Sequence, residues 1–240
     1  MDMSWLLNTP IAHRGLWDES NPENSLGAYQ NAIDAGLNIE IDVHLLPDGD
    51  FAVFHDNNLN RVCGENIKVN KITADKLKDH KLKNVKGEVT DFYIPTLKEV
   101  LDLVDGKVGL LIEMKDFDNS KGACEKLAAQ LKEYKGNYAM QSFGGFAMTW
   151  WRKHTHDIPV GILTCFPLNL FSPLFQLMSK PDFLSYDIKA LAKWFVNYKQ
   201  KRNCPVLSWT IRTENLLQRA KDVDVNNVIF ERIRINEFKK

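Results

Sequence analysis

The 240-residue chain lacks several features that define common protein classes. No apolar run is long enough to cross a bilayer, and the first residues are too short and too weakly basic for a signal peptide. No linker rich in serine, glycine or proline, and no low-complexity tract, divides the chain. These absences favour a single domain over residues 1–240, located in the cytoplasm.

Net charge and paired cysteines are also missing. Lys and Arg together number 31, as do Asp and Glu, so the formal net charge is zero. This balance argues against nucleic acid as a partner, and a phosphate-binding site has to be a local cluster. The four cysteines are scattered, without the spacing of a zinc or redox motif. We therefore expect free thiols in a reducing compartment.

Short strand-like segments alternate with helix-like segments along the whole chain. The alternation predicts a parallel sheet with crossover helices, either a closed barrel or an open doubly wound sheet, and the count of eight strands favours a (β/α)8 TIM barrel. Ser25 is a plausible N-cap, and Thr96 with Glu99 fits a capping box. The predicted strands are 9–13, 39–46, 108–114, 138–143, 159–163, 182–186, 206–211 and 227–230, and the predicted helices are 25–35, 96–104, 122–134, 145–153, 190–201 and 214–221.

Two segments interrupt this alternation. Residues 56–93 are polar and lysine-rich, and they stand where one strand-to-helix connection belongs. We interpret them as a segment inserted after the second strand, near the barrel mouth. Only residues 231–240 follow the eighth strand, so the last helix should be short or absent.

Acidic side chains occur inside two neighbouring predicted strands. Glu40, Asp42 and His44 alternate with apolar residues and therefore share one face, which in a barrel points inward. Glu113 and Lys115 share a face at the end of the next strand, where barrel active sites are built. Carboxylates converging in a desolvated pocket repel each other. The alternatives are a salt-bridge network and a bound cation, for which an all-oxygen set suits Mg²⁺ or Ca²⁺.

Two further histidines are predicted to reach the same rim. His13 and Arg14 end the first strand, and Arg14 supplies a fixed cation suited to a phosphate or carboxylate. Residues 47–50 carry turn chemistry, so a hairpin should return His55 and Asp56 towards Asp42. Histidines for proton transfer beside cations for phosphate suit metal-assisted cleavage of a phosphoester.

The ordered set of these motifs resembles the glycerophosphodiester phosphodiesterase family. The order and the spacing match along the first half of the chain, and weaker similarities continue at 141–143, 182–187 and 209–210. The motifs are His13-Arg14-Gly15, Pro22-Glu23-Asn24-Ser25, Glu40-x-Asp42-Val43, Asp48-Gly49, His55-Asp56 and Glu113-x-Lys115.

The resemblance implies a fold, a reaction and a set of roles. The fold is a (β/α)8 barrel with an insertion after the second strand, and the reaction releases sn-glycerol 3-phosphate and an alcohol from a small glycerophosphodiester. The implied acid/base pair is His13 and His55, either of which could be the acid, and the implied phosphate contacts are Arg14 and Lys115. The implied ligands of one divalent cation, Mg²⁺ or Ca²⁺, are Glu40, Asp42 and Glu113.

The chain departs from the family pattern at the end of the eighth strand. The family usually has a Thr-Asp-Pro-like motif there, whereas this chain has Glu231-Arg232. Residues 166–178 are unusually apolar for a loop: they either pack at the rim or form a lip for weak lipid or membrane contact. Trp209 could line the same pocket. A lipid contact would favour lysophospholipase D-type action on lysophospholipids.

Two other functions fit a barrel with inward carboxylates. A glycosidase also places paired carboxylates across a barrel mouth, but it leaves both histidines and both cations without a role. A non-catalytic barrel could bind a phosphorylated ligand, but the complete metal set and both histidines argue against it.

Overall fold

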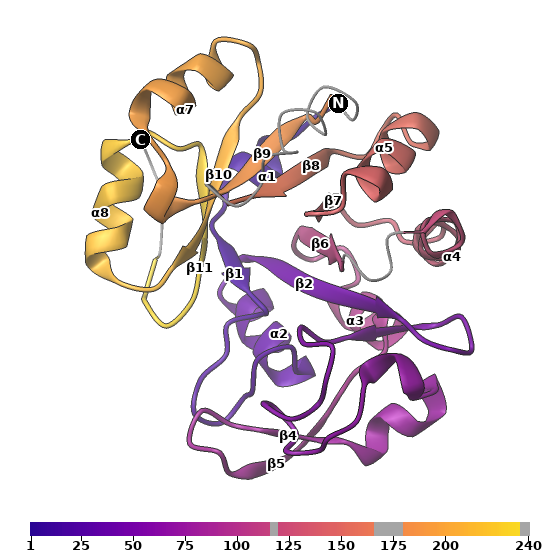
Figure 1. Cartoon of the computed structure of the whole chain (residues 1–240). Helices are drawn as coiled ribbons and strands as arrows, with labels where there is room; N and C mark the ends of the chain where they lie inside the picture. The colour runs from indigo at the N-terminus through magenta and orange to yellow at the C-terminus, as the bar shows by residue number, and fades with distance from the viewer. Residues whose placement is uncertain (116–119, 166–179, 236–240) are drawn as a thin grey trace.

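Eight parallel strands form a closed barrel in the computed structural model, which describes residues 1–115, 120–165 and 180–235 (Figure 1). The barrel closes because β1 pairs with both β2 and β11. This confirms the predicted TIM barrel and excludes the open sheet. The strands in barrel order are β1 (Ile11–His13), β2 (Asn38–Leu45), β6 (Leu110–Met114), β7 (Tyr138–Ser142), β8 (Val160–Thr164), β9 (Phe183–Asp187), β10 (Val206–Ile211) and β11 (Asn227–Phe230).

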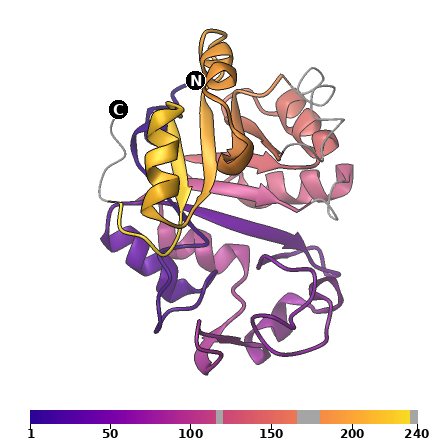
Figure 2. The same ribbon diagram turned by 60° about the vertical axis from the view of Figure 1, so that its left-hand side comes forward.

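Helices surround the barrel on its outer face (Figures 1 and 2). Ser25 caps α2 through the Ala28 amide, and the predicted capping box of Thr96 and Glu99 is present. One helix begins later than predicted, because the 3-10 turn η4 (Ile188–Ala190) precedes it. The outer helices are α2 (Leu26–Asp34), α3 (Leu97–Val104), α4 (Lys121–Leu131), α5 (Gly145–His154), α7 (Lys193–Gln200) and α8 (Glu214–Asp222).

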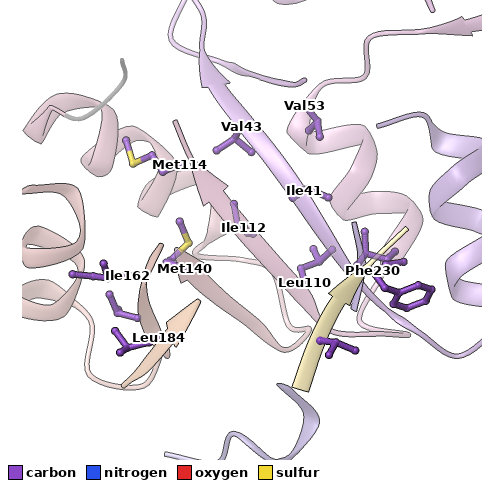
Figure 3. Packing of buried hydrophobic residues seen from close by; sticks show 14 of the residues in the cluster. Ile41, Val43, Val53, Leu110, Ile112, Met114, Met140, Ile162, Leu184 and Phe230 are labelled. Carbon is purple, nitrogen blue, oxygen red and sulfur yellow. The ribbon is translucent and has the colours of Figure 1, made fainter. Parts of the chain in front are cut away.

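The largest hydrophobic cluster lies between the barrel and its helices. Ile41 and Val43 of β2 and Ile112 of β6 point to this side and are fully buried (Figure 3). They are the apolar set that strand alternation assigned to the outer face. The acidic residues between them therefore face the barrel interior, as predicted.

A short helix that the sequence analysis did not predict, α1 (Ser4–Asn8), covers the N-terminal end of the barrel. Its Leu6 is buried in a cluster with interior residues such as Leu111 and Ile229. Asn38 and Asn227 stand at the starts of their strands, and both side chains donate to backbone carbonyls at or just after this helix. The interior is thus closed below the candidate site.

The inserted segment follows a hairpin, as predicted. β3 (Phe51–Val53) pairs antiparallel with β2, and the backbone N–H of Phe54 donates to the Asp42 carbonyl. Phe51 packs in the main cluster, whereas Ala52 and Phe54 face a second cluster that includes Leu59, Leu77 and Leu82. The segment therefore has a hydrophobic cluster of its own. Its elements are η1 (Val69–Lys71), η2 (Ala74–Asp79), β4 (Lys81–Lys83) and β5 (Val89–Tyr93).

Three smaller predictions concern cysteines, membranes and the apolar loop. All four cysteines are free thiols. Among the described residues, no helix combines the length and hydrophobicity needed to cross a membrane. The apolar loop 166–178 lies outside the described residues, so its predicted lipid contact stays a prediction.

Candidate active site

The first strand ends in a left-handed turn that orients His13 and Arg14. Arg14 has φ 59° and Gly15 has φ 84°. The Arg14 amide donates to both the backbone carbonyl and the carboxylate of Glu40, at 3.0 and 3.1 Å. A Cβ atom on Gly15 would lie 2.9 Å from Ala28, so only glycine allows helix α2 to approach this turn.

Three carboxylates converge on the inner face of two neighbouring strands. Glu40 and Asp42 come from β2 and Glu113 from β6, and Asp42 stands in register with Glu113. One oxygen from each carboxylate lies within 4.8 Å of the other two, the separation expected of atoms that share a metal ion. Glu40 and Asp42 are buried, and the Glu113 side chain is 12% exposed.

Two cations compensate part of this charge. Lys115 Nζ lies 2.6 Å from Asp42 Oδ1 and 2.6 Å from Glu113 Oε1, and Arg14 Nε lies 3.4 Å from Asp42 Oδ2. Burial alone would raise the pKa of Asp42, but Lys115 and Arg14 hold it well below its usual range. Asp42 is therefore ionised at neutral pH.

Glu40 differs from Asp42 because, among the residues that the structure describes, no lysine or arginine side chain forms an ion pair with it. Burial, together with the charges of Asp42 and Glu113, raises the pKa of Glu40 well above its usual range. Burial also raises the pKa of Glu113. The cluster thus has too little positive charge to keep all three carboxylates ionised. A bound divalent cation would supply the missing positive charge.

Each of the two predicted acid/base histidines contacts a carboxylate that is itself held by an arginine. His13 Nδ1 lies 2.5 Å from Glu231 Oε2, and the other oxygen of Glu231 accepts from Arg212 Nε. Burial lowers the pKa of His13. Burial acts to raise the pKa of Glu231, but the hydrogen bond and charge of His13 and the contact with Arg212 lower it to about 2.

His55 stands on the loop after β3, where the hairpin prediction placed it. Its Nδ1 lies 2.6 Å from Asp56 Oδ1, and Arg61 Nε donates to the other Asp56 oxygen at 2.7 Å. Arg61 also forms two 2.7 Å hydrogen bonds to Glu23, which accepts a third from Arg14. This network joins the inserted segment to the barrel rim.

These groups surround a cavity of about 500 Å³ at the barrel mouth. Asp42 lies beneath the cavity with no exposed surface. Trp209 is on the opposite wall, edge-on to Phe143, where Leu163 and Ile229 add further apolar surface. All eight residues that we assigned to the site are therefore gathered in one place. The seven that line the cavity are His13, Arg14, Glu40, His55, Glu113, Lys115 and Trp209.

His44 supports the site from outside the cavity. Its Nε2 lies 3.2 Å from the His55 carbonyl oxygen, and the side chain is buried. It therefore holds the loop that carries His55.

Four charged residues around the site have no role that could be assigned from the sequence. Three of them, Glu23, Arg61 and Arg212, form ion pairs between segments that are distant in sequence. No local sequence pattern predicts such pairs. Glu231 offered one signal, because it is an acid directly after the apolar strand β11. We noted it only as a departure from the family pattern.

Comparison with known proteins identifies the family and agrees with the fold. The profile of the glycerophosphoryl diester phosphodiesterase family matches residues 13–235, nearly the whole chain. The chain belongs to this family. Membership confirms the predicted enzyme class, a phosphoric diester hydrolase acting on glycerophosphodiesters, and it sets aside the glycosidase and the non-catalytic barrel.

The relatives match this chain over differing shares of their length. A glycerophosphodiester phosphodiesterase of Caldanaerobacter subterraneus is 27% identical over 227 residues, covering 91% of this chain and 92% of the relative. A phosphodiesterase of Oleispira antarctica, solved in complex with the product sn-glycerol-3-phosphate, has a TM-score of 0.81 at 25% identity and covers 94% of this chain and 93% of its own. A lysophospholipase D of Rattus norvegicus is 33% identical over 137 residues, 54% of this chain and 42% of the relative.

Proposed function

We propose that this phosphodiesterase requires one divalent cation, Mg²⁺ or Ca²⁺, held by Glu40, Asp42 and Glu113. The observation that carries the proposal is the charge deficit of this cluster, in which two of three carboxyl groups have a raised pKa. The donors are all oxygens, which suits these hard cations better than zinc or copper. When bound, the cation would withdraw electrons from a phosphate oxygen and offset the charge of the transition state.

The chain's own cations would bind the rest of the phosphate. Arg14 and Lys115 line the cavity beside the carboxylates, and both are held by ion pairs at its floor. Fixed donors of this kind stabilise developing negative charge without reorganising during the reaction. The apolar face of Trp209 would pack against the glycerol or the alcohol group on the opposite side.

His13 and His55 would exchange protons with the substrate. Each uses Nδ1 for a carboxylate, so each has Nε2 available on the cavity side. One histidine would take a proton from the nucleophile, either water or the glycerol 2-hydroxyl, and the other would give a proton to the leaving alcohol oxygen. If the 2-hydroxyl attacks, water then opens the resulting cyclic phosphate. The product would be sn-glycerol 3-phosphate with a free alcohol, the product that occupies the Oleispira antarctica relative.

Lysophospholipase D-type action is the second candidate. It is supported by the apolar wall of Phe143, Leu163, Trp209 and Ile229 and by the similarity to the rat lysophospholipase D. This wall could hold part of an acyl chain, whereas a small polar alcohol needs no such surface.

One assay tests both candidates. Release of glycerol 3-phosphate from glycerophosphocholine and glycerophosphoethanolamine, and of lysophosphatidic acid from a lysophospholipid, is measured with EDTA and with added Mg²⁺ or Ca²⁺. We expect EDTA to abolish product formation and one of the two ions to restore it. Full activity in EDTA-treated, metal-free enzyme would refute the metal requirement. Turnover of the lysophospholipid alone would favour the second candidate.

A further inference from the structure

The end of β11 supplies a carboxylate to the site that the proposed mechanism does not use. Glu231 follows the strand directly, and its side chain is only 8% exposed. One oxygen contacts His13 Nδ1 and the other accepts from Arg212 Nε. Both oxygens are therefore committed, and the carboxylate has a fixed orientation.

This contact decides which nitrogen of His13 carries a proton. An ionised carboxylate only accepts hydrogen bonds, so the neutral imidazole beside it must donate from Nδ1. Nε2 then carries the lone pair. That nitrogen lies 4.0 Å from Glu40 Oε2, on the side of the metal-ligand cluster. The arrangement parallels the contact between His55 and Asp56, which Arg61 holds from behind.

We propose that Glu231, fixed by Arg212, is the positioning residue of His13: it selects the imidazole tautomer and aims Nε2 into the substrate cavity. The inference rests on the proposed role of His13 in proton transfer. Glu231 acts through His13 and need not touch the substrate. In this chain the eighth strand thus completes the site with its own carboxylate.

Arg212 has the complementary task. Its side chain is half-exposed and lines the cavity, yet its Nε is committed to Glu231. Removing the guanidinium would leave one Glu231 oxygen without its donor and allow the carboxylate to rotate. Arg212→Gln should therefore lower kcat in the same direction as a change at Glu231, but by less.

The test combines kinetics with nitrogen NMR. In Glu231→Gln the amide keeps the size of the side chain but can present N–H to Nδ1, which favours the other tautomer. We expect kcat to fall roughly 10–100-fold, the range for loss of a group that orients a functional histidine, with KM changed by less than about twofold. Glu231→Asp, which keeps the carboxylate, should recover part of the rate. Glu125→Gln, on the exposed surface of α4, is the matched control and should match the unsubstituted enzyme.

Long-range ¹H–¹⁵N spectra give a readout that does not need activity. The His13 signal, assigned by its loss in His13→Gln, should show Nδ1–H in the unsubstituted protein and shift towards Nε2–H in Glu231→Gln. The same tautomer in both proteins, or a rise in KM at constant kcat, would overturn the proposal. If the unsubstituted enzyme cleaves no glycerophosphodiester, the proposed function fails, while the spectra still decide whether Glu231 sets the tautomer.

Discussion

Metal binding should release a proton from the carboxylate cluster. Without a cation, the raised pKa of Glu40 means that this carboxyl group binds a proton at pH values where an ordinary glutamate is ionised. A divalent cation requires the ionised form, so binding must expel that proton. We expect each ion to release protons mainly from Glu40, with a smaller contribution from Glu113 because its pKa is also raised.

Isothermal titration calorimetry measures this release. Mg²⁺ or Ca²⁺ is titrated at pH 6 into metal-free enzyme in several buffers that differ in ionisation enthalpy. The observed binding enthalpy is plotted against the ionisation enthalpy of the buffer, and the slope gives the number of protons released. The slope should decrease as pH rises, because a carboxyl group with a raised pKa loses its proton before the metal arrives. In Glu40→Gln the slope should fall to the small contribution of Glu113.

Binding should also stabilise the fold. At a free ion concentration 100 times the Kd, the stabilisation is about 2.7 kcal/mol, which corresponds to a rise in Tm of roughly 5–10 °C for a domain of this size. Tight binding with a zero slope at pH 6 would show that Glu40 is already ionised in the metal-free enzyme. Our account of the charge deficit would then be wrong.

Three further outcomes follow from the geometry. His13→Ala or His55→Ala should lower kcat roughly 10²–10⁴-fold, the usual range for a general acid or base. Steady-state assays with saturating metal measure this loss, and near-normal activity in either variant would show that the histidine is dispensable. The pKa of Glu231 is about 2 in the folded protein, against an ordinary value of 4.5. Its ionisation therefore stabilises the folded state by up to about 3 kcal/mol above about pH 4.5, and this stabilisation is lost as the pH falls towards 2. Urea unfolding should therefore separate Glu231→Gln from the unsubstituted protein most at neutral pH, and a constant gap down to pH 3 would contradict this. Trp151 is fully buried in the main cluster. Trp151→Ala should therefore lower the free energy of unfolding by roughly 3–5 kcal/mol, again measured by urea unfolding. A loss below about 1 kcal/mol would mean that the surrounding helices close the cavity.

The barrel and most of its site could be predicted from local patterns. Alternation along β2 placed Glu40 and Asp42 on the inner face, and the turn at 47–50 correctly returned His55 to the same rim. These inferences succeed because strand geometry repeats every two residues, whatever the rest of the chain does.

The connections between distant segments could not be predicted in the same way. Arg61 reaches Glu23 across the boundary between the insertion and the barrel, and Arg212 reaches Glu231 between neighbouring strands. The chain has 31 basic and 31 acidic residues, and many of them could form such pairs. Only the folded backbone determines which residues meet. Helix α1 was missed for a related reason, since five residues at a chain end carry too little periodicity to predict a helix.

The inserted segment makes the two halves of the proposed chemistry separable. The proposed metal ligands belong to strands of the barrel, whereas His55 and Arg61 lie where the chain enters a segment with its own hydrophobic cluster. Local opening of that smaller cluster would carry a proton donor or acceptor away while leaving the carboxylates in place. The enzyme would then retain its ion but stop turning over, so the speed and extent of this opening could set an upper limit on the catalytic rate.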